Sequence, residues 1–126
     1  MTRTRTTLAL VLAGTAALAA VPAQAGVSAA RKPQKKTVAV GDNYFQPSRL
    51  TVNRDSTVRF AWADDAAEIH DVKLVKGPRG VKKWQSEPGG FGYVYRRTLR
   101  KPGTYRLVCT FHVADGMKMT IVVRRR

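Results

Sequence analysis

Apolar and polar residues alternate with a period of two along most of the chain after residue 36. In residues 56–62, for example, Val58, Phe60 and Trp62 fall on one face of an extended chain. Similar short runs lie at residues 37–40, 49–52, 70–75, 105–109 and 117–123, and Gly, Pro, Asn or Asp residues separate many of them. No segment has the 3.6-residue periodicity of an amphipathic helix. This pattern predicts an all-β fold, a Greek-key β-sandwich or barrel.

Two stretches depart from simple alternation. In residues 91–99, alternation places Arg97 on the same face as Tyr95 and Leu99. We therefore expect either a β-bulge that shifts the register or a strand at the edge of a sheet. Residues 76–90 combine basic residues with Gly and Pro, so we expect a long basic loop, with Trp84 as a candidate exposed side chain.

The first 25 residues indicate a cleavable secretory signal peptide. They have a basic start, a short apolar run and the sequence Ala23-Gln24-Ala25, which is the small-residue pattern of a cleavage site. The run is short for a transmembrane helix, which needs about 20 residues, and an uncleaved anchor is the alternative. We expect residues 26–36 to form a flexible basic leader and residues 37–124 to form one folded domain. The protein is therefore expected to be secreted, periplasmic or otherwise extracytoplasmic.

The chain is strongly basic, with a formal net charge of +15. Such a charge often indicates nucleic-acid binding, but export argues against that partner. An anionic cell envelope or an acidic redox protein fits better, and solubility alone is the other interpretation. Lysine and arginine pairs at 82–83, 96–97 and 100–101 are candidates for a basic docking face, and half of the acids gather in residues 64–71. We expect a monomer.

The alternation also places three metal-ligating residue types on inward faces. These are His70, Cys109 and Met117, and His112 lies in the loop between the last two. Each residue alone would be read as an ordinary core residue. However, the chain has only two histidines and one cysteine, and a free exposed thiol outside the cell would oxidise. Two imidazoles, a thiolate and a weak thioether together describe a type 1 blue-copper site.

The motifs around these residues resemble those of the cupredoxins, the plastocyanin-like small blue copper proteins. CTFHVADGM matches the C-x-x-H-x-x-x-x-M loop of that family, and GMKMTIVV resembles its last strand. FQPSRLTV with STVRF, IHDV and KPGTYRLVC resemble its opening strands, its first-ligand strand and its approach to the cysteine. The resemblance implies a cupredoxin-like fold and one copper ion, with His70, Cys109 and His112 as equatorial ligands and Met117 as axial ligand.

The chain also departs from the family pattern. Asp71 stands where relatives often have Asn, and we expect it to accept hydrogen bonds from loop N–H groups and to lower the reduction potential. Phe111 replaces a frequent proline, and Met119 is a rival axial ligand on the same strand face. The resemblance further implies that the edge of His112 is the electron exit. Candidate apolar residues around that edge are Phe45, Pro47 and Val113.

These observations leave several functions open. The first is an exported one-electron carrier that cycles between Cu(I) and Cu(II) and contacts redox partners weakly. The alternative is a copper-binding or copper-delivery protein without a dedicated electron-transfer role, and zinc could occupy the same ligands in vitro. We do not expect an enzyme, because further copper centres require histidines and none remains after His70 and His112.

Overall fold

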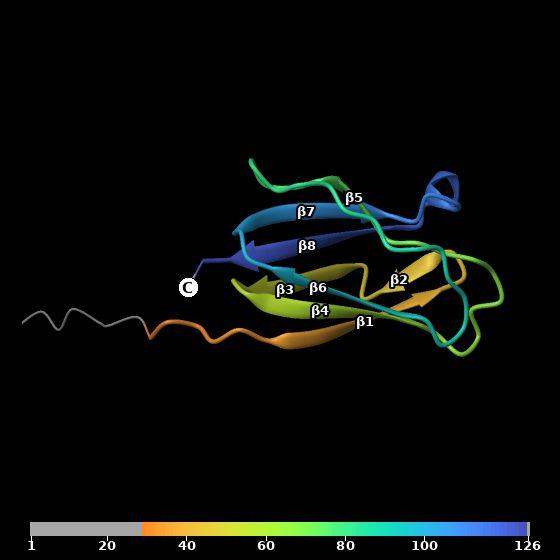
Figure 1. Cartoon of the computed structure of the whole chain (residues 1–126), viewed down its shortest axis with the longest axis horizontal. Helices are drawn as coiled ribbons and strands as arrows, with labels where there is room; N and C mark the ends of the chain where they lie inside the picture. Colours follow the sequence, from red (N-terminus) through yellow and green to blue (C-terminus); the bar gives the residue numbers. More distant parts are fainter. Residues whose placement is uncertain (1–28, 126) are drawn as a thin grey trace, which may run out of the picture.

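The computed structural model describes residues 29–125, and the predicted signal peptide lies outside this range. Two four-stranded sheets pack face to face, with strand orders β2-β1-β4-β6 and β3-β8-β7-β5 (Figure 1). The strands are β1 (Lys35–Gly41), β2 (Tyr44–Gln46), β3 (Arg49–Asn53), β4 (Ser56–Trp62), β5 (Lys73–Lys76), β6 (Val94–Leu99), β7 (Gly103–Val108) and β8 (Lys118–Arg124). The predicted all-β sandwich is therefore confirmed. No helix among residues 29–125 is long and apolar enough to cross a membrane.

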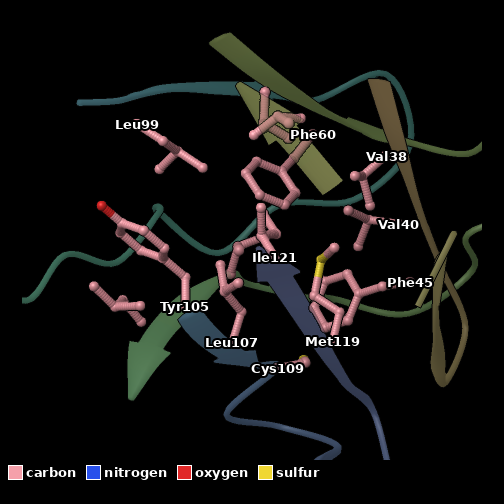
Figure 2. Close-up of a cluster of buried hydrophobic side chains, with 14 of the residues drawn as sticks. Val38, Val40, Phe45, Phe60, Leu99, Tyr105, Leu107, Cys109, Met119 and Ile121 are labelled. Carbon is pink, nitrogen blue, oxygen red and sulfur yellow. The ribbon is translucent and has the colours of Figure 1, made fainter. Parts of the chain in front are cut away.

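The hydrophobic core lies between the two sheets, and period-two burial builds it. In β4, every second residue from Ser56 to Trp62 is buried and the residues between are half-buried. The pair β1–β4 and the pair β3–β8 are parallel, and the other strand pairs are antiparallel. Figure 2 shows inward side chains of both sheets meeting in the core. Phe60 of one sheet faces Ile121 of the other, and Cys109 lies at the margin of the cluster. Full burial of a side chain such as Phe60 contributes about 1.5–3 kcal/mol.

The strand that contains Arg97, β6, is one of the two edge strands of its sheet. β6 pairs with β4 along its whole length without a register shift, so the edge prediction is confirmed and the bulge prediction is wrong. The inward Arg97 is accommodated because its guanidinium lies over the Trp84 ring, 5.1 Å from the ring centroid. Trp84 is half-buried against Phe60 and Tyr95, so it covers the open side of the core instead of projecting into solvent.

The long basic segment after β5 is tied to the residues before it. Ser86 exchanges hydrogen bonds with Val72, since Ser86 N donates to Val72 O at 2.9 Å and Val72 N donates to Ser86 Oγ at 3.0 Å. His70 and Gly89 likewise exchange two backbone hydrogen bonds of 2.9 Å each. The segment therefore acts as a partner strand for residues 70–74 without regular sheet geometry, which fixes His70 at the end of the sandwich.

Candidate metal centre

Three predicted ligands converge at one end of the sandwich. Nδ1 of His70 lies 3.1 Å from Nδ1 of His112, and Sγ of Cys109 lies 3.8 Å and 3.6 Å from these two nitrogens. His70 and Cys109 are fully buried, and the His112 side chain is 16% exposed. Chain segments far apart in the sequence thus bring two imidazoles and a thiol to one point.

The loop between Cys109 and Met117 is held by its own backbone. Cys109 N donates to Met117 O at 3.1 Å, and Met117 N donates to His112 O at 3.1 Å. A 3₁₀ turn, Val113–Asp115, follows His112, and Gly116 ends it with φ = 86°, a left-handed conformation that glycine adopts without strain. The loop therefore presents Cys109 and His112 from a closed, hydrogen-bonded frame.

The register of β7 and β8 distinguishes the two methionines. Val108 pairs with Lys118 and Leu107 pairs with Met119. The next pair toward the loop is Cys109 with Met117, which is fully buried. Directly opposed residues in an antiparallel pair have Cβ atoms about 4.5–5.5 Å apart and share a face. Met117 is therefore the neighbour of Cys109, whereas Met119 lies two residue pairs deeper on the same face, among the core side chains (Figure 2).

Two carboxylates contact the outer nitrogens of the histidine rings. Nε2 of His70 lies 2.8 Å from Oδ1 of Asp42, and Nε2 of His112 lies 2.9 Å from Oε2 of Glu68. An ionised carboxylate only accepts hydrogen bonds, so each Nε2 carries the proton and each Nδ1 of a neutral ring presents a lone pair. Two such lone pairs, 3.1 Å apart beside a buried sulfur, are suited to hold a metal cation between them.

The three atoms fit a metal ion. A point equidistant from the two Nδ1 atoms and Sγ lies about 2 Å from each, which is close to metal–imidazole and metal–thiolate bond lengths. Among residues 29–125, these three form the group of potential metal ligands that includes the cysteine, with ligand atoms within 4.8 Å of one another. The donor set of two imidazoles and a soft thiolate suits copper.

Comparison with known proteins agrees with this chemistry. Residues 33–124 match the model of the copper binding proteins of the plastocyanin/azurin family. The chain belongs to this family. It is 32% identical over 123 residues to a plastocyanin from Prochlorothrix hollandica. The alignment covers 92% of this chain and 87% of the relative.

Solved structures also resemble the fold. A Sinorhizobium pseudoazurin aligns with a TM-score of 0.61 and 27% identity over 72% of this chain and 74% of its own. A copper-containing nitrite reductase from Thermus scotoductus SA-01 aligns with a TM-score of 0.63 and 30% identity, but only 24% of that chain is covered. The protein is thus a cupredoxin with copper as its cofactor, and the predicted resemblance is confirmed.

Asp42 is a partner of this cupredoxin site that sequence reasoning missed. Its carboxylate accepts from the backbone N–H groups of Ala67 and Glu68, each at 3.1 Å, as well as from His70. The hydrogen bond from His70, with help from these N–H groups, lowers the pKa of Asp42 below its usual value. Asp42 lies in the turn between β1 and β2, 28 residues before His70, and no motif spacing pointed to it.

Asp71 accepts the predicted hydrogen bond from the cysteine loop, and its effect on the reduction potential stays a prediction. It is fully buried and accepts hydrogen bonds from Thr110 N at 2.7 Å, Thr110 Oγ1 at 2.6 Å and Gln85 Nε2 at 2.6 Å. Thr110 is the residue after Cys109, so Asp71 joins the His70 segment to the cysteine loop. The Gln85 bond adds the long basic segment to the same junction.

The residues on either side of His112 in sequence are apolar and exposed, but one predicted member of the surface around its edge is wrong. Val113 and Phe111 are exposed at 44% and 54%. Phe45 is instead buried, because it is the inward residue of the short strand β2, which the sequence pattern did not reveal.

Proposed function

We propose that the protein binds one copper ion through His70, Cys109 and His112, with Met117 as a weak axial ligand, and carries single electrons between redox partners. The convergence of two Nδ1 atoms and one Sγ within 3.8 Å of one another carries this proposal. Copper supplies the Cu(I)/Cu(II) couple, and the donor set suits both oxidation states. Membership of the plastocyanin/azurin family supports the same role.

The protein contributes a rigid ligand frame and an exit for the electron. His70 is held by paired backbone hydrogen bonds to Gly89, and Cys109 by its bond to Met117. Ligands fixed in this way move little when the charge of the site changes, which keeps the reorganisation cost low. The partly exposed ring of His112 lies beside the exposed Val113 and Phe111 in sequence, so we propose its edge as the contact with redox partners.

The alternative function is copper delivery, in which the metal is the cargo. Complete burial of His70 and Cys109 favours retention of the metal over its rapid transfer. The two functions separate in one measurement. A carrier exchanges electrons with a small redox protein much faster than it loses Cu(I) to a competing chelator, and a delivery protein shows the reverse order. We propose no enzymatic role for the chain alone, because both of its histidines lie in the cluster with Cys109 and none is left for a further copper centre.

The charge around the copper end suggests which partner surface docks there. Four segments meet at this end, namely residues 41–48, 62–72, 86–93 and 109–117, and they hold seven of the eight acids and no lysine or arginine. We therefore propose that a redox partner presents a basic rim to the copper end. The expected acidic partner or anionic cell envelope suits the remaining, strongly basic surface.

Export is part of the proposal. The A-x-A pattern before Gly26 supports cleavage there, and the protein would then act outside the cytoplasm as a monomer of one cupredoxin domain. N-terminal sequencing of the exported protein tests this. A mature chain that begins at Gly26 supports it, and retention of residues 1–25 in the mature protein would favour the anchor.

The deciding experiment is a visible and EPR spectrum of residues 26–126 with one equivalent of Cu(II). The proposal expects intense thiolate-to-copper absorption and narrow copper hyperfine splitting. The Cys109→Ser variant should lose the strong colour but keep the fold, and Met119→Leu, which leaves the four proposed ligands intact, should keep the colour. A pale, ordinary Cu(II) spectrum in the unmodified protein, or intense colour in Cys109→Ser, would overturn the assignment.

A further inference from the structure

The contact between His70 and Asp42 is more strongly built than a surface ion pair. The Asp42 carboxylate accepts from Ala67 N, Glu68 N and His70 Nε2, so both of its oxygens are engaged. Asn43, the next residue, has φ = 62°, which turns the chain sharply after Asp42. The carboxylate is therefore oriented by the backbone on both sides before it meets the imidazole.

We propose that Asp42 is a positioning residue that fixes the orientation and tautomer of His70 and lowers the reduction potential of the copper. The inference rests on the proposed function, because it assumes that His70 Nδ1 binds the metal. A carboxylate on the outer nitrogen of a ligating histidine keeps the proton there and leaves the inner nitrogen free. It also makes the imidazole a stronger donor, which favours Cu(II) over Cu(I).

The difference in burial makes Asp42 the link between His70 and the surface. The His70 side chain is fully buried, and Asp42, whose side chain is 34% exposed, accepts from its Nε2 at 2.8 Å. Glu68 differs, since it is 53% exposed and contacts His112, whose ring reaches the surface. Asp71 differs as well, because it bonds to Thr110 and Gln85 and not to a ligand ring. Asp42 is therefore the carboxylate that acts directly on the buried histidine.

The position of Asp42 in the fold explains how it also braces the site. Asp42 follows β1 in the first sheet, whereas Cys109 follows β7 in the second. Residues 67 and 68, which donate to Asp42, belong to the connection from β4 to β5, which passes from one sheet to the other. The carboxylate thus joins the β1–β2 turn, the sheet-crossing connection and the ligand.

Asp42→Asn in the complete copper-loaded protein tests the proposal. The variant keeps the size of the side chain and one acceptor oxygen but removes the charge. Asp64→Asn is the matched control, because Asp64 is an exposed aspartate on the same connection as His70. We expect the potential of Asp42→Asn, measured by protein-film voltammetry, to rise clearly above that of the control. Equal potentials for the two variants would overturn the electronic part of the proposal.

The metal-free protein gives a second readout that does not depend on copper. ¹⁵N NMR of the His70 ring should show the proton on Nε2 in the unmodified protein and in Asp64→Asn. In Asp42→Ala the ring should populate both tautomers. A proton on Nδ1 in the unmodified protein, or an unchanged ring in Asp42→Ala, would overturn the positioning role.

The two failures can be told apart. If the unmodified protein lacks a type 1 spectrum, the proposed function fails first. If the spectrum is present but Asp42→Asn behaves as the control does, only this inference fails. Should Asp42→Asn not fold, the ring tautomer of the unmodified protein still decides the question.

Discussion

Replacement of Asp71 tests how the ligand segments are held together. The carboxylate is fully buried and accepts three hydrogen bonds, two from Thr110 and one from Gln85. Asp71→Ala removes all three acceptors at once. The backbone N–H of Thr110 then loses its partner, whereas the Thr110 hydroxyl and the Gln85 amide belong to exposed residues and reach water.

The expected cost follows from these differences. A hydrogen bond to a charged group is worth about 1.5–3 kcal/mol, and the partly buried Thr110 N–H, left without its acceptor, adds to this cost. We expect Asp71→Ala to lower the free energy of unfolding by about 3 kcal/mol. For a domain of this size that corresponds to a fall in Tm of roughly 12–24 °C. Asp71→Asn keeps an acceptor for Thr110 N and removes a buried charge, so we expect a loss of only about 1 kcal/mol.

Urea denaturation of the metal-free protein measures these values. Asp64→Ala, on the exposed part of the same connection, is the control and should stay within about 0.5 kcal/mol of the unmodified protein. The reasoning is refuted if Asp71→Ala is as stable as this control, or if Asp71→Asn is as unstable as Asp71→Ala. In the copper-loaded protein, Asp71→Asn should also raise the reduction potential, because a negative charge near the thiolate is lost.

Three further predictions follow from single contacts. Met117→Leu should keep the copper but raise its potential, because a weak donor to Cu(II) is lost; an unchanged potential in voltammetry would remove Met117 as axial ligand. Burial raises the pKa of Tyr105 above 10, so its contribution to stability is present below pH 10 and is lost as the pH rises through the folded pKa. Denaturation at pH 9 and pH 11 should show a smaller decline for Tyr105→Phe, and an equal decline would contradict this. Gly103→Ala should lower the free energy of unfolding by about 1–3 kcal/mol, since φ is 134° and the new Cβ would lie 2.7 Å from Pro78. In Gly92→Ala, the control, the new Cβ meets no atom within 4 Å, so the loss measured by urea denaturation should be smaller.

The strands that alternate most regularly were the most predictable from the sequence. β4 spans residues 56–62 as expected, and β3 and β8 differ from their predicted ranges by about one residue. β2 was missed because three residues followed by Pro47 do not establish a period. β5 begins three residues later than predicted because residues 70–72 pair with the irregular segment at 85–89 and not with a strand.

The residues of the metal site likewise divide into those that the sequence identified and those that only the structure revealed. His70, Cys109 and His112 were identifiable because histidine and cysteine are rare in this chain, because alternation places His70 and Cys109 on inward faces, and because His112 lies in the loop after Cys109. The sequence favoured Met117 over Met119 by spacing alone. The register of β7 and β8 gives the physical reason, because it places Met117 opposite Cys109. Asp42 could not be found from the sequence, because its contact with His70 depends on the arrangement of a turn and a distant connection. Aspartate in such a turn is common and carries no signal of its own.

The distribution of charge links the site to its surroundings. The chain has a net charge of +15, yet lysine and arginine are absent from residues 41–48, 62–72, 86–93 and 109–117. Carboxylates there serve two needs, since Asp42 and Asp71 hold ligand segments and the exposed acids shape the outer field. The opposed charges make the molecule strongly polar, and such a field orients a protein during encounter. A partner with a basic rim would therefore meet the copper end first, whereas anionic surfaces would attract the rest of the molecule and leave the edge of His112 accessible.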